Sequence, residues 1–217
     1  MSKRILDKLE VLQGNIVNLK DKYGKNIIVD AVVNSAKPTL MCGAGVSRAI
    51  YNYVNSYNAN ISNFLENEII KETDKGIVNA NRNRIRCSTN EIFVTEGYGL
   101  CNYIFHAVAP NWDGGSKSCI KSLQKCYENI IDSMIEKNCE TIAIPIISSG
   151  HNKFPFDLAA KIAIVSISNY LIKLQNCDKL KYNQIKKIYL VVYTEDDFEP
   201  INEIFEYYKY NITCCAS

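Results

Sequence analysis

Val33-Asn34-Ser35-Ala36 is followed a few residues later by Cys42-Gly43-Ala44-Gly45-Val46, and these two stretches decide the expected fold. The run before them, Asn26–Val33, is apolar and β-branched, which predicts a strand covered on both faces. After them, apolar residues recur at helical spacing as far as Val54. A glycine-rich turn that opens a helix lets backbone N–H groups and the positive end of the helix dipole hold an anion. The pattern therefore predicts a phosphate-binding loop.

A second loop of the same kind is expected downstream. Thr141–Ile147 has the composition of a buried strand, Ser148-Ser149-Gly150-His151-Asn152 is a small polar turn, and Phe156–Leu174 is a predicted helix. Two anion-binding loops at the ends of neighbouring strands suit a diphosphate.

The remaining patterns predict alternating strands and helices. Strands are expected at Leu9–Gln13, Glu91–Thr95, Tyr103–Val108 and Ile188–Tyr193, and helices at Gly45–Tyr57, Ser116–Lys137 and Phe198–Tyr208. This alternation predicts an α/β fold, a three-layer α/β/α sandwich on a mixed, mostly parallel central sheet. We expect a single domain over residues 1–208 and a short C-terminal tail, residues 209–217. The polar segment Asn55–Arg86, with an amphipathic stretch at Ile61–Lys75, is expected to be a surface excursion.

Composition narrows the class of protein. The 217 residues carry a formal net charge of +2, which gives no strong electrostatic attraction to nucleic acid. Nine cysteines occur without a C-x-x-C pair, so we expect reduced thiols, no metal site and a cytoplasmic or nuclear location. The charged start Met1–Lys8 does not resemble a signal peptide. We expect a monomer that needs no cofactor.

The chain ends in Cys214-Cys215-Ala216-Ser217, which fits the C-a-a-X pattern for farnesylation of Cys214. A chance match is the competing explanation, because Cys215 is not aliphatic. Membrane association is expected only if Cys214 is prenylated, and a single lipid chain would make it weak and reversible.

Four segments in the same order and spacing resemble the macro domain family, from about Leu9 to about Tyr208. The family's first loop has the form V-N-A-A-N-x-x-L-x-G-G-G-V-x-x-A-I, which Val33–Ile50 follows. The other matches are Gly14-Asn15-Ile16 for G-D-I, Tyr103–Pro110 for Y-V-I-H-A-V-G-P, and Ile142–Gly150 for I-A-F-P-A-I-S-T-G. The sequences of these motifs are most similar to those of alphavirus-type and PARP-associated macro domains, which suggests a viral or eukaryotic source. The resemblance implies binding of ADP-ribose or of ADP-ribosylated protein.

The resemblance also implies a ligand site, made of Asn15, Ile16, Asn34, Lys37, Gly43, Ala44, Gly45, Val46, Ser148, Ser149, Gly150, His151, Asn152 and Tyr193. In this reading Asn15 meets adenine and Tyr193 stacks on it, although Tyr193 could instead be a core residue. Asn34 either lines the distal ribose or braces the loop with its amide. The glycines either contact phosphate or only shape the turns.

The chain departs from the family at positions linked to catalysis. Asn15 replaces the acid that accepts a hydrogen bond from the adenine amino group, and its amide oxygen can still accept one. Lys37 replaces the second asparagine of N-A-A-N, and Ser47 stands where some hydrolases of the family carry an acid. Asn152 and Lys153 replace an aromatic residue and a glycine. No Asp or Glu occurs from residue 31 to residue 65, so the first loop has no carboxylate general base.

Three functions stay open from the sequence. The first is a reader that binds ADP-ribose with weak or no turnover, and the second is a mono-ADP-ribosyl hydrolase in which His151 substitutes for the missing base. His151 could equally point to solvent, and His106, in an apolar strand, is expected to be a core histidine. The third is a nucleic-acid or poly-ADP-ribose binder, since Arg82, Arg84 and Arg86 would share one face of a strand. A solvated charged surface explains that triplet better, and we do not expect nucleic-acid binding.

Overall fold

The computed structural model describes residues 6–77 and 81–215, with side chains as far as residue 210. A six-stranded sheet with the order β1-β6-β5-β2-β4-β3 forms its centre. The strands are β1 (Leu9–Gln13), β2 (Ala31–Ala36), β3 (Ile92–Glu96), β4 (Tyr103–Val108), β5 (Thr141–Pro145) and β6 (Lys187–Val192). Every neighbouring pair is parallel except β3 with β4. The prediction of a mixed, mostly parallel sheet is confirmed.

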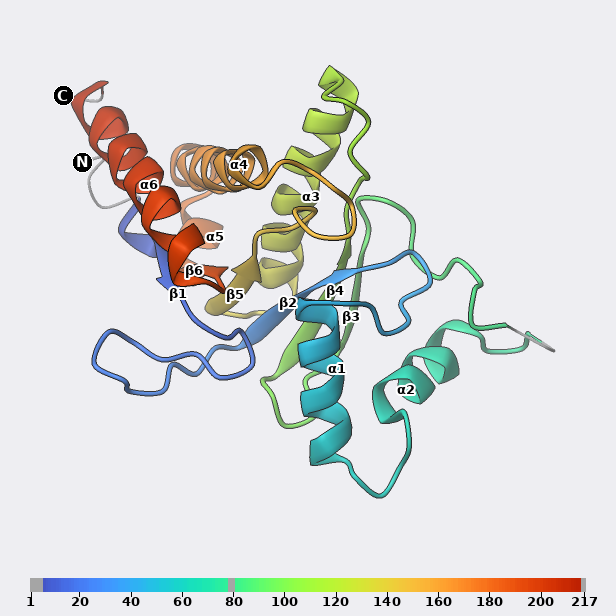
Figure 1. Ribbon diagram of the computed structural model, residues 1–217. Coiled ribbons are helices and arrows are strands. Elements are labelled where there is room, and N and C mark those ends of the chain that lie inside the picture. Colours follow the sequence, from blue (N-terminus) through green and yellow to red (C-terminus); the bar gives the residue numbers. More distant parts are fainter. Residues whose placement is uncertain (1–5, 78–80, 216–217) are drawn as a thin grey trace.

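Helices cover both faces of this sheet. They are α1 (Val46–Tyr57), α2 (Phe64–Thr73), α3 (Lys117–Glu136), α4 (Phe156–Cys177), α5 (Lys179–Gln184) and α6 (Glu195–Cys215), with one 3₁₀ turn at Leu6–Lys8. Figure 1 shows α3, α4 and α6 on one side of the sheet and α1 and α2 on the other. The molecule is therefore the predicted three-layer α/β/α sandwich.

Each face of the sheet has its own hydrophobic core. Along β2, Ala31 and Val33 belong to the core under α3 and α4, whereas Val32 belongs to the core under α1 and α2. Successive side chains of a strand point to opposite faces, so a strand buried on both sides must be apolar throughout. This explains why the central strands lack an alternation of polar and apolar residues.

The strand β2 begins five residues later than the sequence pattern indicated, at Ala31 rather than Asn26. Before Ala31 the chain forms a small hairpin: Ile27 N–H donates to Leu19 O at 2.9 Å. Ile28 is 88% exposed. Asp30 ends this segment, because its carboxylate accepts the N–H groups of Glu140 and Thr141, both at 2.9 Å. The strand then extends through Asn34 to Ala36, in register with β4.

The excursion between α1 and β3 contains α2 and an internal group of ion pairs. Asp74 binds Arg84 at 2.7 Å and Arg86 at 2.6 Å, and the Arg86 side chain is fully buried. The backbone N–H of Arg86 also donates to Pro38 O at 2.8 Å. Arg82 reaches Glu66 at 4.0 Å. The three arginines do not lie in a strand. Arg82 is exposed, as a solvated charged surface predicts, whereas Arg86 is buried against Asp74 and ties the excursion to the first loop.

The last helix begins with a side-chain cap and is longer than expected. Thr194 Oγ1 accepts the N–H of Asp197 at 3.2 Å, which satisfies one of the free donors of the first turn. The helix α6 runs on to Cys215, beyond residue 209 where a tail was expected to begin. The side chain of Cys214 lies outside the described residues, so its lipidation stays a prediction. In the part of the chain that the structure describes, none of the helices has the length and apolar character of a membrane span.

The buried ion pair gives a stability prediction. Asp74→Ala leaves the fully buried Arg86 without its counter-charge, so we expect a loss of about 3 kcal/mol in the free energy of unfolding at pH 7. The hydrogen bond from Arg86 is the main cause that lowers the pKa of Asp74. A lowered carboxyl pKa stabilises the fold above the unfolded pKa, and this contribution is lost as pH falls through the folded pKa. The effect of the substitution should therefore shrink in acid.

Urea denaturation at neutral and acidic pH measures this difference. The matched control is Glu128→Ala, which removes one partner of the exposed Lys125–Glu128 pair at 3.3 Å and should cost less than about 1 kcal/mol. Equal effects of the two substitutions would contradict a structural role for Asp74.

Candidate functional site

A pocket of about 510 Å³ opens where four parallel strands end. The strands are neighbours in the sheet, β1, β6, β5 and β2, and their carboxyl ends lie at one edge. The residues that line the pocket come from the carboxyl ends of these strands, the loops that follow them and the start of α1: Gly14, Asn15, Ile16, Ser35, Ala36, Lys37, Gly43, Ala44, Gly45, Val46, Ser47, Ala49, Pro145, Ile146, Ser148, Ser149, Gly150, His151, Asn152, Val191 and Tyr193. All the predicted site residues are among them except Asn34.

The first loop presents an uncapped helix N-terminus to the pocket. Gly45 is the N-cap of α1, with φ 54° and ψ −128°, and no side chain caps the helix. The first N–H groups of a helix have no acceptor inside it, so those of α1 are available to a ligand. A Cβ added to Gly45 would meet nothing within 4 Å, which shows that this backbone borders open space. A side chain at this position would be strained and would project into the pocket.

Hydrogen bonds from behind hold this loop in place. The hydroxyl oxygen of Ser47 accepts the N–H of Gly43 at 3.0 Å, and the Tyr51 hydroxyl donates to Leu40 O. Leu40 is fully buried and has a positive φ of 58°, so the turn depends on these contacts. Ser47, at the position where some family members carry an acid, is thus a bracing residue in this protein.

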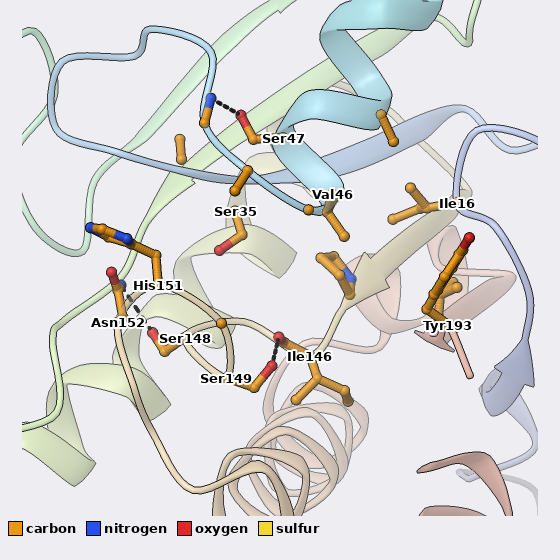
Figure 2. Close-up of a pocket in the computed structure, with 18 of the residues that line it drawn as sticks. Ile16, Ser35, Val46, Ser47, Ile146, Ser148, Ser149, His151, Asn152 and Tyr193 are labelled. Carbon is orange, nitrogen blue, oxygen red and sulfur yellow. Dashed lines mark hydrogen bonds between the residues drawn. The ribbon is translucent and has the colours of Figure 1, made fainter. Parts of the chain in front are cut away.

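The second loop is braced by its own side chains. The hydroxyl of Ser148 donates to Pro110 O at 3.1 Å, and that of Ser149 donates to Ile146 O at 2.9 Å. The amide of Asn152 donates to Ala109 O at 3.0 Å and to Pro110 O at 3.1 Å. Because these protons point to protein carbonyls, the loop offers a ligand mainly its backbone. Figure 2 shows this loop facing Val46 across the pocket.

Asn34 lies behind the pocket and not in its wall. The side chain is 1% exposed, and its Nδ2 lies 3.0 Å from His106 Nδ1. The other ring nitrogen, Nε2, lies 3.1 Å from Thr95 Oγ1. An amide Nδ2 only donates, so Nδ1 accepts and the imidazole proton faces Thr95. The amide therefore joins β2 to His106, while its Oδ1 has no hydrogen-bond partner among the described residues, and the contact with a ribose stays a prediction.

His106 is the core histidine that the sequence predicted. Complete burial lowers its pKa to about 3, because the charged imidazolium is disfavoured away from water. The ring therefore stays neutral at physiological pH and joins Asn34 to Thr95.

The two ends of the pocket differ in character. Figure 2 shows Tyr193 and Ile16 at one end, with His151 and Asn152 at the other. Tyr193 is 71% exposed, so it is not a core tyrosine, and its ring is free to stack on a ligand. At the opposite end His151 is exposed, and Lys37, which also lines the pocket, is exposed too. None of the described residues that line the pocket is an aspartate or a glutamate.

The structure adds eight lining residues that were not predicted as site residues: Gly14, Ser35, Ala36, Ser47, Ala49, Pro145, Ile146 and Val191. Gly14, Ser35 and Ala36 stand next to a predicted residue at or just after the carboxyl end of a strand, and this adjacency was the signal available for them. The described residues contain no group of three or more His, Cys, Asp or Glu side chains arranged to hold a metal ion.

Comparison with known proteins identifies the family. The sequence pattern of the Macro domain family matches residues 33–163. The chain belongs to the macro domain family. A macro domain-containing protein of Methanosarcina mazei is 30% identical over 91% of this chain and 88% of its own length. A second, from Caldanaerobacter subterraneus subsp. tengcongensis, is 30% identical over 92% of this chain and 97% of its own length.

Solved structures agree on the fold. A mutant of the Oceanobacillus iheyensis macrodomain superposes with a TM-score of 0.70 at 24% identity, over 94% of this chain and 93% of that chain. The Trypanosoma brucei macrodomain in complex with ADP-ribose gives a TM-score of 0.68 at 21% identity, over 92% and 70%. The two curated relatives are archaeal and bacterial proteins, so the expected link to alphavirus-type and PARP-associated macro domains, and to a viral or eukaryotic source, is not supported.

The buried histidine gives a pH prediction. The chain has two histidines, so a His151→Gln variant leaves His106 as the sole imidazole for nuclear magnetic resonance. We expect this imidazole not to titrate above about pH 4, given its pKa of about 3. An unfolded histidine has a pKa of about 6.5, so the unfolded chain binds the extra proton between these values. Stability should then fall as pH drops below about 6.5, by at most about 1.4 kcal/mol per pH unit from this group. A titration midpoint near 6.5 would contradict the Asn34–His106–Thr95 arrangement.

Proposed function

We propose that this protein binds ADP-ribose, free or attached to a protein, and acts as a reader with weak or no turnover. The observation that carries the proposal is a pocket with two backbone-rich loops and no carboxylate among the described residues that line it. The first half of this observation supports binding, and the second argues against catalysis.

Binding is supported by the match between the pocket and the parts of the ligand. The free N–H groups at the start of α1 and the backbone of the loop Ser148–Asn152 face the same space, which suits two linked phosphates. The exposed ring of Tyr193 at one end suits a base. His151, exposed at the other end, leaves room for a ribose that continues into a modified protein. A Trypanosoma brucei macrodomain of the same fold forms a complex with ADP-ribose.

Weak turnover is supported by the hydrogen bonds and charges of the polar residues in the two loops. Ser47 accepts a hydrogen bond from Gly43, and the Asn152 amide donates to two carbonyls. Lys37 carries an ammonium group, which cannot accept a proton. A positioned general base contributes typically 10²–10⁴-fold to a rate. Among the described residues of the pocket wall, His151 is the side chain suited to that role at neutral pH.

A mono-ADP-ribosyl hydrolase is the second candidate function. The observation that favours it is the position of His151, which lines the pocket at the end opposite Tyr193 and is exposed. An imidazole at that end would supply the general base that this reaction needs.

The binding prediction is tested by thermal shift and calorimetry. ADP-ribose should stabilise the protein and bind more tightly than AMP, because AMP supplies a single phosphate to the two loops. A ligand at a hundredfold excess over Kd stabilises the native state by about 2.7 kcal/mol. Gly45→Val should abolish binding, since its side chain would occupy the space that the phosphates need.

The matched control for this variant is Gly24→Val. Gly24 also has a positive φ, of 80°, with no atom within 4 Å of an added Cβ, but it lies in the hairpin before β2 and does not line the pocket. Both variants should lose similar stability, whereas Gly24→Val should keep its affinity for ADP-ribose. No stabilisation of the parent protein at millimolar ADP-ribose would overturn the proposed function.

The turnover prediction concerns ADP-ribose on an acidic side chain. We expect release to be slower by about 10²–10⁴-fold than by a macro domain with the full N-A-A-N loop, because a positioned base is missing. Any residual turnover should fall in His151→Ala, with Lys153→Ala as a control from the same turn. If the parent protein releases ADP-ribose as fast as that reference macro domain, the reader function is contradicted and the hydrolase function is supported.

A further inference from the structure

At the end of the pocket beside Tyr193, which we call the base end, Asn15 supplies an amide side chain that can form hydrogen bonds with a nucleobase. The other lining residues of this end are Gly14, Ile16, Val191 and Tyr193, which offer backbone, apolar surface and an aromatic ring. Stacking on an aromatic ring is tolerant of base identity, because every base has a π-face. A ring that stacks on the base holds its hydroxyl in the plane of the ring, away from the base edge, so discrimination at C6 by a side chain depends on Asn15.

The structure fixes which end of the Asn15 amide is engaged. Its Oδ1 accepts the N–H of Val17 at 3.3 Å. A backbone N–H only donates, so the atom that faces it is the oxygen, and the Nδ2 group with its two N–H donors is left for a ligand. Asn15 is exposed, and its backbone is held by the Asn18 N–H, which donates to Asn15 O at 2.8 Å. The free hydrogen-bonding group at the base end is thus a donor on a neutral side chain.

Resting on the proposed function, we infer that this pocket accepts 6-oxopurine nucleoside diphosphate riboses as well as it accepts ADP-ribose. Adenine carries an amino group at C6, which donates, whereas hypoxanthine and guanine carry a carbonyl oxygen there, which accepts. The Asn15 amide can donate to that oxygen through Nδ2, and the second lone pair of Oδ1 can still accept from an adenine amino group. A carboxylate at the same position would only accept, and it would repel a carbonyl oxygen.

The absence of acids from the described pocket wall strengthens this inference. An aspartate or glutamate near the base would favour adenine over a 6-oxopurine even without direct contact. Its negative charge attracts the amino protons at C6 and repels a carbonyl oxygen there. The described lining residues include none, and the hydrogen-bonding group that faces the base is uncharged. The base end therefore lacks the electrostatic feature that would exclude a 6-oxopurine.

The test compares two ligands that differ only in the base, where hydrogen bonding changes at C6 and at N1. Calorimetry gives the Kd of ADP-ribose and of its deaminated analogue, in which hypoxanthine replaces adenine, for the full chain. We expect the two values to agree within about threefold, since each complex gains one neutral hydrogen bond to Asn15. In Asn15→Asp the ratio should shift by roughly tenfold toward ADP-ribose, because a charged acceptor strengthens the bond to an amino group and opposes the carbonyl oxygen.

The matched control is Asn18→Asp, which adds the same charge to the same turn. Asn18 is exposed and does not line the pocket, so the ratio should stay at the parent value. Circular dichroism checks that each variant folds, and the ratio for the parent protein tests the inference without any variant.

The outcomes separate this inference from the proposed function. If the parent protein binds ADP-ribose and rejects the hypoxanthine analogue by more than about tenfold, the inference is overturned and the reader stands. If Asn15→Asp folds and leaves the ratio unchanged, Asn15 does not set base preference and the inference is also overturned. If neither ligand binds, both the inference and the proposed function fall.

Discussion

The parallel alignment of four neighbouring strands is the constraint on which the site depends. Because β1, β6, β5 and β2 run in one direction, their carboxyl ends meet at one edge, and every lining residue of the pocket lies at such an end or in the segment after it. At the opposite edge the Asp30 carboxylate joins the starts of β2 and β5 through three hydrogen bonds of 2.9 Å, to Glu140 and Thr141. Two loops far apart in sequence are thereby brought to face each other.

In the site, polar side chains brace the loops, and backbone N–H groups face the pocket. The polar side chains of Ser47, Ser148, Ser149 and Asn152 are directed at main-chain groups of the loops that carry them or of adjacent segments. Backbone N–H groups are left to face the pocket, and they present a rigid set of donors without side-chain entropy to lose. The excursion that carries α2 extends this support, since Arg86 binds Pro38 O behind the first loop.

Sequence patterns identified the architecture and most of the pocket, and the exceptions have physical causes. β4 has the predicted bounds because its apolar run coincides with its pairing, whereas the run before β2 includes an exposed hairpin that hydrophobicity alone does not separate from a strand. Alternation of Arg82, Arg84 and Arg86 indicated a surface, but the partners Glu66 and Asp74 lie elsewhere in the chain and appear only after folding. The burial of Asn34 behind the pocket was not predictable for a similar reason, since its partner His106 belongs to the neighbouring strand of the sheet.

The missing side-chain cap of α1 has a consequence for how occupancy of the pocket is linked to folding. Gly45 leaves the first turn without the internal acceptor that Thr194 supplies to α6 or Ser116 to α3. An oxyanion held against these N–H groups is chemically an N-cap, and such a cap stabilises a helix by about 0.5–2 kcal/mol. The helices α2 and α4 also lack a side-chain cap, but α1 begins at the pocket, so a ligand bound there would supply its cap and contribute to the stability of the fold.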